Sequence, residues 1–253
     1  MTEDSRGSQR SRIQKISRNF FLHIHASRVH THSLKFRATF GLGVALALLF
    51  LILLVTGVLL MLYYTPSVQE AYSSVKEIVF VVKGGRIIRN LHRWAAHGMV
   101  VLVFLHLIRV FYTGGFLKKR TLNWNIGIAM LLVTLFLSFS GYLLPWDQLA
   151  FWAVTVAVSA AEAAPPAEIL GTNINLLIRG APNFGAGGLL RWYLLHVLVL
   201  PLLTGIFLFV HYYKVVLHGH SLPPGREKIG EDTAKRVPKS DRTYFIPDLI
   251  TSE

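Results

Sequence analysis

Residues 189–213 read LLRWYLLHVLVLPLLTGIFLFVHYY. Between Arg191 and Lys214 this stretch contains no Asp, Glu, Lys or Arg. Its length exceeds the roughly 20 residues that a helix needs to cross about 30 Å of hydrocarbon at about 1.5 Å per residue. The stretch also contains two histidines, His196 and His211. It therefore predicts a transmembrane helix that places imidazoles inside the membrane.

Three more apolar runs share this character, and the composition agrees with them. The chain of 253 residues is 53% hydrophobic and only 15% charged, which is too apolar for a soluble domain of this size. The runs cover residues 39–64, 94–108 and 124–146; the second reaches 116 if the Arg109 side chain snorkels to an interface. A shorter run, residues 149–161 before Pro165, fits a helix that lies in the interface. We predict an all-α integral membrane four-helix bundle with one short interfacial helix.

The flanking segments are basic and set the orientation. Residues 13–21 have the spacing of an amphipathic surface helix, and the residues after 213 are polar, which is typical of a solvated tail. With four spans, 19 of the 26 Lys and Arg fall on the side of the two termini. This side is predicted to be the cytoplasm of a bacterial or archaeal cell, because Lys and Arg concentrate on the cytoplasmic side of membrane proteins. In so apolar a chain, the net charge of +13 indicates basic loops at a membrane rather than a nucleic-acid partner. The predicted domains are 1–36 (cytoplasmic segment), 37–217 (membrane domain) and 218–253 (cytoplasmic tail).

Four histidines lie within or at the ends of the second and fourth spans. His92 and His106 are 14 residues apart, and His196 and His211 are 15 apart, so each helix presents two imidazoles within about 40–60° of one face. The two helices run in the same direction, which matches His92 in depth with His196, and His106 with His211. Each pair is predicted to supply the axial ligands of one haem b. Because the chain has no cysteine, thioether-linked haem is excluded.

Glycines and arginines support this interpretation. The glycines of the first span and those of the third repeat at the same interval of 14 residues, which predicts room for a flat macrocycle; ordinary small-residue helix contacts are the alternative. The arginines flank the histidines and are candidate partners of haem propionates. The residues are Gly43, Gly57, Gly127 and Gly141, and Arg89, Arg93, Arg191 and Arg109. For Arg109 a snorkelling anchor is the alternative. His97 points away from His92 and is predicted to pack.

The strings IIRNLHRW (87–94), FLHLIRVFYTGGF (104–116), GYLLPWDQ (141–148) and residues 189–213 resemble the N-terminal half of di-haem cytochrome b, the core of Rieske/cytochrome b quinol oxidoreductases. The interval of 15 residues resembles the split type of that family. The resemblance implies quinol oxidation on the positive side and electron transfer through the two haems to a quinone on the negative side. It also implies a Rieske iron–sulfur protein, a c-type cytochrome and a dimeric complex as partners.

The resemblance names residues for the two quinone pockets. They are Tyr142, Pro145, Trp146 and Asp147 on the positive side, and Lys214, His218 and His220 on the negative side. Asp147 has a second interpretation as the N-cap of the short helix, and the basic residues after 213 have one as a solvated turn.

Two departures from the family limit this analogy. The Pro-Glu-Trp-Tyr segment of the family is absent from the chain, so a separate C-terminal subunit is expected to supply it. The Cys that attaches a further haem in photosynthetic members corresponds to Leu49, so two non-covalent haems are expected. The alternatives are a haem b anchor of another respiratory dehydrogenase or reductase without a Rieske partner, and a haem-free transporter or scaffold.

Overall fold

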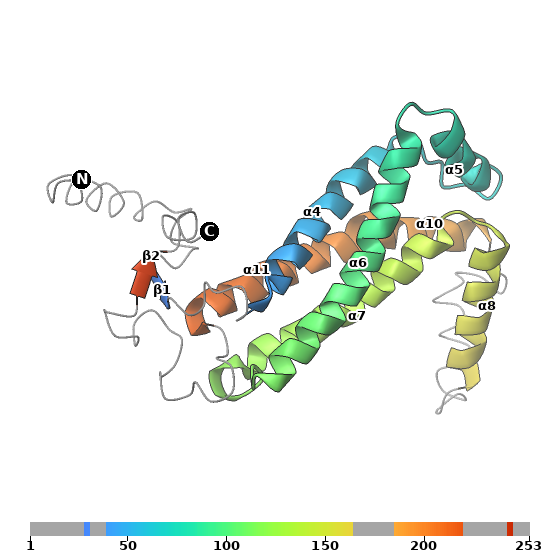
Figure 1. Ribbon diagram of the computed structural model, residues 1–253. Coiled ribbons are helices and arrows are strands. Elements are labelled where there is room, and N and C mark those ends of the chain that lie inside the picture. The colour runs from blue at the N-terminus through green and yellow to red at the C-terminus, as the bar shows by residue number, and fades with distance from the viewer. Residues whose placement is uncertain (1–27, 31–38, 164–184, 220–241, 245–253) are drawn as a thin grey trace, which may run out of the picture. The chain divides into compact units, whose positions relative to one another are not determined.

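The computed structural model describes residues 28–30, 39–163, 185–219 and 242–244. Its helices are α4 (Leu42–Met61), α5 (Ala71–Phe80), α6 (Gly85–Tyr112), the 3₁₀ turn η2 (Lys118–Arg120), α7 (Thr121–Leu143), α8 (Gln148–Ala163), α10 (Ala186–Leu194), the π-helical turn η3 (Leu195–Val199) and α11 (Leu200–His218) (Figure 1). Two short strands, β1 (Arg28–His30) and β2 (Arg242–Tyr244), complete the described part. The amphipathic helix predicted near residues 13–21 lies outside these residues.

Four helices are long and apolar enough to cross a membrane: α4, α6, α7 and the continuous segment Ala186–His218. Large apolar side chains project outward from them, including Val44 at 77% exposure, Leu62 just past α4 at 70% and Leu202 at 61%. Small or hydroxylated residues such as Thr56, Ala95, Ser140 and Thr204 are buried instead. An apolar exterior around a core of small polar residues is the pattern of a membrane protein. The prediction of four membrane spans is confirmed.

The second span begins earlier than its charge-free run indicated. Helix α6 starts at Gly85, nine residues before Trp94, and so includes both Arg89 and Arg93. Gly84, at φ +80°, makes the turn that precedes it, and a Cβ on Gly85 would overlap the Ile78 carbonyl. Arginine is tolerated near a helix end because its long side chain reaches the interface. A charge-free run therefore underestimates the length of such a helix.

The short apolar helix is present and slightly longer than predicted. Helix α8 buries Ala150, Val154 and Val158 at intervals of four residues, against Leu143 and Trp192. Its other face exposes large side chains, among them Trp152 at 57%. At 16 residues it is too short to span, and one buried stripe is what an interfacial helix needs.

One helix and one two-stranded ladder were not predicted from the sequence. Helix α5 lies in the connection between α4 and α6 and buries Ala71, Ser74 and Ile78. Strand β1 pairs antiparallel with β2, with Arg28 opposite Tyr244. Residues 242–244, which fall in the segment predicted to be a solvated tail, form one strand of this two-stranded ladder.

The described residues form two compact units: one comprises 28–30, 39–43, 105–128, 207–219 and 242–244, the other 44–104, 129–163 and 185–206. Each of the four long helices contributes to both units. His106 and His211 fall in the first unit, and His92 and His196 in the second.

Candidate functional site

In the second unit, the imidazoles of His92 and His196 face each other. His92 is on α6 and His196 is in η3; their ring centroids are 6.3 Å apart and their planes are inclined at 70°. A hydroxyl from a neighbouring helix contacts each ring: Thr56 Oγ1 is 2.8 Å from His92 Nδ1, and Ser140 Oγ is 2.9 Å from His196 Nδ1. Helices α4 and α7, which have no histidine of their own within their described lengths, thus hold the imidazoles of α6 and η3.

In the first unit, His106 and His211 form a second pair of the same geometry. Their ring centroids are 6.4 Å apart and their planes are inclined at 72°. The backbone of Asn123 lies beside the His211 imidazole. Among the described residues, no hydrogen bond of standard geometry reaches the buried Nδ1 of His211.

One glycine lies against each of the four imidazoles. A Cβ built on the glycine would lie 2.6 Å from Cε1 of His196 at Gly141, and 3.3 Å from Cε1 of His92 at Gly57. The corresponding distances in the first unit are 3.9 Å from His106 at Gly43 and 3.7 Å from His211 at Gly127. The interval of 14 residues therefore places these glycines opposite histidine rings, which was not foreseen: the sequence only indicated room for the macrocycle.

The spacing within each pair fits two axial ligands of one metal. Two metal–imidazole bonds of about 2.0 Å, with roughly half a ring beyond each nitrogen, place the ring centroids about 6 Å apart. Within the described residues no three His, Cys, Asp or Glu side chains gather as a metal site. Two protein ligands suffice only where the metal brings its remaining ligands, as in haem. The residues present therefore fit a bis-histidine haem at each pair.

The π-helical turn accounts for the unequal histidine intervals. On a regular helix, 15 residues leave His196 and His211 about 60° apart around the axis. The turn at Leu195–Val199 is wider than an α-helical turn and accommodates an additional residue. Pro201 follows directly and has no N–H to donate, which favours an irregular turn before it. His196 itself lies in this π turn.

The candidate propionate partners differ in their surroundings. Arg89 is half-buried and close enough to Arg93 and Asp147 for charge interactions, whereas Arg93 and Arg191 are exposed. Arg109 is also half-buried and lies near the charge of Arg120. The charge of Asp147 in the PWDQ turn thus acts on Arg89, three residues before His92, a relation that the sequence did not reveal.

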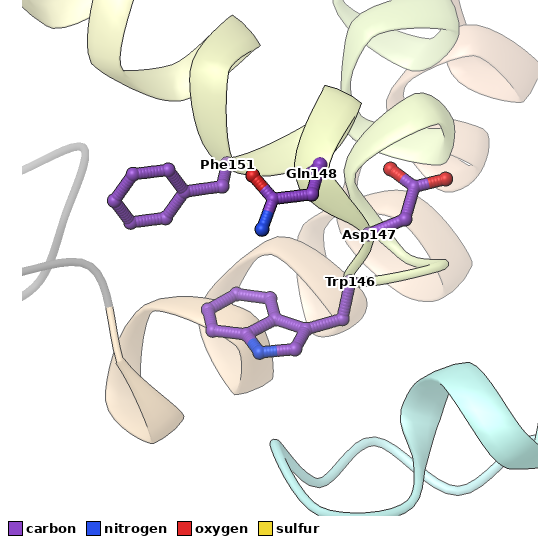
Figure 2. Close-up of a pocket in the computed structure, with 4 residues that line it drawn as sticks. All are labelled: Trp146, Asp147, Gln148 and Phe151. Carbon is purple, nitrogen blue, oxygen red and sulfur yellow. The ribbon is translucent and has the colours of Figure 1, made fainter.

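A pocket of about 330 Å³ lies at the start of α8, lined by Trp146, Asp147, Gln148 and Phe151 (Figure 2). Two of these residues were predicted; Gln148 and Phe151 were not, and Tyr142 and Pro145 are not among its lining residues. The Asp147 carboxylate points away from the Phe151 ring (Figure 2) and accepts a hydrogen bond from the Ala150 N–H at 2.9 Å. The interpretation of Asp147 as the N-cap of the short helix is confirmed.

On the other side, the predicted basic residues lie at the end of α11. Lys214 and His218 are half-buried, and His220 lies outside the described residues. Arg120 donates from Nε to the Gly219 carbonyl at 3.3 Å and from Nη2 to the His218 carbonyl at 3.4 Å. This guanidinium satisfies carbonyls that the helix end leaves without intrahelical partners.

Tyr64 was not singled out from the sequence. Its hydroxyl donates to the Leu144 carbonyl at 2.7 Å, and its ring stacks on Tyr193 at 5.6 Å. It thus ties the end of α4 to the turn that contains Pro145 and Trp146, where Trp146 adopts φ +52°. Burial and then the neighbouring Tyr193 raise the pKa of Tyr64 above its ordinary value. The phenol therefore remains a donor at neutral pH, and its stabilisation is lost only as the pH rises beyond about 10.

We expect Tyr64→Phe to lower the free energy of unfolding by about 1 kcal/mol, because the Leu144 carbonyl loses its donor. Thermal unfolding of the detergent-solubilised chain measures this loss. Tyr193→Phe is the matched control, since it keeps the ring stack and leaves the Tyr64 hydroxyl bond intact. Equal melting temperatures for the two variants would contradict the assigned role.

Comparison with known proteins finds a matching family and several relatives. The family model described as Cytochrome b/b6/petB matches residues 28–220. The cytochrome b6 of Heliobacterium mobile is 44% identical over 182 residues, which cover 72% of this chain and 84% of that protein. The cytochrome b6 of Porphyra purpurea is 42% identical over 174 residues, which cover 69% and 80%.

A solved structure described as a hyperthermophilic respiratory Complex III matches with a TM-score of 0.79 at 26% identity, over 96% of this chain. This chain spans 61% of the length of that solved chain. The predicted resemblance to split cytochrome b is confirmed by the cytochrome b6 relatives. Since the family model matches most of its residues, the chain belongs to the cytochrome b/b6 family of membrane electron-transport proteins, which bind haem b.

Proposed function

We propose that this chain holds two non-covalent haems b, one between His92 and His196 and the other between His106 and His211. The observation that carries the proposal is the pair of imidazole–imidazole distances, 6.3 and 6.4 Å, each suited to one metal between two rings. The glycine opposite each ring supports it, because a side chain there would press on the ligand.

The residues of the chain have separate tasks in such a site. A bound haem supplies reversible one-electron chemistry. The imidazoles bind the metal, and the glycines leave them room. Arg89, Arg93 and Arg191 offer charge-assisted hydrogen bonds to propionates of the first haem, and Arg109 offers them to the second.

We further propose that the chain is the electron-transfer subunit of a cytochrome bc-type quinol oxidoreductase. The names of its relatives, cytochrome b6 and a respiratory Complex III, support this role. In this role, the pocket at Trp146 and Phe151 takes part in quinol oxidation on the positive side of the membrane. Lys214, His218 and His220 take part in quinone reduction on the negative side. The chain termini lie on the negative side. A separate C-terminal subunit, a Rieske iron–sulfur protein and a c-type cytochrome are the proposed partners, with the latter accepting the electrons.

The test of the haem proposal is a reduced pyridine haemochrome assay on the purified full-length chain. We expect two haems b per chain, both extracted by acidic acetone because neither is covalently attached. A chain without low-spin haem would overturn the proposal and favour a transporter or scaffold. Two haems together with a co-purifying dehydrogenase and no Rieske protein would instead favour the anchor of another respiratory enzyme.

A further inference from the structure

Hydroxyl groups from two neighbouring helices lie within hydrogen-bond distance of Nδ1 in both imidazoles of the His92–His196 pair. Thr56 Oγ1 on α4 is 2.8 Å from His92 Nδ1. Ser140 Oγ on α7 is 2.9 Å from His196 Nδ1. Both hydroxyl-bearing residues are buried, at 5% and 0% exposure. The direction of each hydrogen bond, from hydroxyl to imidazole or from imidazole to hydroxyl, determines which nitrogen of the histidine carries the proton.

A count of protons determines this direction. Thr56 Oγ1 donates to the Ile52 carbonyl at 2.6 Å, and Ser140 Oγ donates to the Leu137 carbonyl at 3.1 Å. A hydroxyl has one proton and two acceptor lone pairs. Because the only hydroxyl proton is used in the hydrogen bond to the backbone carbonyl, the hydroxyl oxygen can only accept a hydrogen bond from the imidazole. Nδ1 of each ring must then carry the proton, and Nε2 must carry the lone pair.

We propose that Thr56 and Ser140 are positioning residues that hold His92 and His196 in the Nδ1–H tautomer and fix the angle of each ring. The proposal rests on the function proposed above, in which these histidines bind haem. In that site, Nε2 is the nitrogen left free to bind the metal. A partner that accepts a hydrogen bond from the Nδ1–H group also increases the basicity of the ligating nitrogen, Nε2. More basic axial ligands favour the ferric state, so the two hydroxyls lower the midpoint potential of the first haem.

The second pair offers an internal comparison. At His211 the buried Nδ1 receives no hydrogen bond of standard geometry from the described residues. The Asn123 backbone lies beside it, as the Leu53 and Leu137 backbones lie beside His92 and His196, but among the described residues no hydroxyl is bonded to it. Removal of Thr56 or Ser140 is therefore expected to act on the first haem and to leave the second one unchanged.

The test uses Thr56→Val and Ser140→Ala in the full-length chain, purified with whatever subunits accompany it. We expect the affinity for the first haem to fall about tenfold or more for each variant. Haem that remains at this site is expected to titrate at a higher midpoint potential, with a shifted α-band in the reduced spectrum. Thr56→Ser keeps the oxygen and is expected to restore the original haem content and potential.

The matched control is Thr204→Val. Thr204 is buried at 6% exposure and donates to the Leu200 carbonyl at 2.8 Å, as Thr56 does to Ile52, but among the described residues it has no hydrogen bond to an imidazole. Haem content and potentials equal to those of this control would overturn the proposal, and so would a Thr56→Ser variant that behaves like Thr56→Val. The second haem serves as the folding reference: loss of both haems from Thr56→Val and also from Ser140→Ala would show a structural role and contradict the proposal. A wild-type chain without haem would instead refute the proposed function.

Discussion

Replacement of His106 or His211 by alanine is expected to remove one haem from each chain and to leave the other. The two rings are 6.4 Å apart in one unit, and the rings of His92 and His196 are 6.3 Å apart in the other. A haem with one of its two axial imidazoles missing loses its low-spin character and much of its affinity. The pyridine haemochrome assay and the low-spin α-bands of the reduced protein measure the result.

Double variants test the pairing itself. His106→Ala combined with His211→Ala removes ligands from the same site, so the double variant is expected to lose no more haem than either single variant. His92→Ala combined with His106→Ala removes ligands from both sites and is expected to lose both haems. Non-additivity within a site and additivity between sites are the signature of residues that act as pairs. The opposite pattern would show that the histidines pair differently.

His97→Ala is the control for these substitutions. His97 lies on the same helix α6, is exposed, and contacts the Trp94 ring edge-on at 5.6 Å. It is expected to retain two haems. Loss of a haem from this variant would mean that any histidine deletion in α6 disturbs the protein.

Gly141→Ala is expected to have the second largest effect, the loss of the haem between His92 and His196. The new Cβ would lie 2.6 Å from Cε1, 3.2 Å from Nε2 and 3.3 Å from Nδ1 of His196, so it would press on the whole edge of the ring. The ring has little freedom to move, because Nδ1 is bonded to Ser140 and Nε2 is the proposed ligand. Overpacking of this kind costs about 1–3 kcal/mol, which corresponds to roughly a 5- to 150-fold loss of affinity.

The other three glycines form a graded series that makes this prediction quantitative. A Cβ at Gly57 would lie 3.3 Å from His92, while the distances at Gly127 and Gly43 are 3.7 and 3.9 Å, which is ordinary van der Waals contact. Haem content is therefore expected to fall most for Gly141→Ala, less for Gly57→Ala and little for Gly43→Ala or Gly127→Ala. Equal retention by all four alanine variants would contradict the close approach between glycine and ligand. Gly205→Ala is the control, since within the described residues no atom outside its own helix backbone and chain neighbours lies within 4 Å of its Cβ position.

The charge-free runs predicted the four spans correctly but not where each one begins or ends. The run around His106 begins at Trp94, whereas α6 begins at Gly85 and includes Arg89 and Arg93. Arginines near a helix end reach the interface, so hydropathy alone cannot place the terminus. Helix α5 was missed because it combines charged residues with a stripe of only three buried positions, Ala71, Ser74 and Ile78.

The candidate pockets were predicted less well than the histidines. Asp147 was left with two interpretations, and only the distance of 2.9 Å between its Oδ1 and the Ala150 N–H identified it as an N-cap. Gln148 and Phe151 line the pocket one helical turn apart, a relation that is visible only once α8 is known to start at Gln148. Tyr64 contacts a carbonyl 80 residues away, and no local signal encodes such a contact.

By itself, the sequence determined the number of spans, the parallel direction of the two histidine-bearing helices and the four imidazoles within the apolar segments. These properties follow from hydropathy and from helical periodicity, which are local to each segment. The tertiary structure alone decided that the Thr56 and Ser140 hydroxyls lie 2.8 and 2.9 Å from Nδ1 of two imidazoles, that a glycine lies against each ring, and that a π turn contains His196. These features depend on the rotation and the depth of each helix relative to its neighbours, and both are set by packing across segments far apart in the chain.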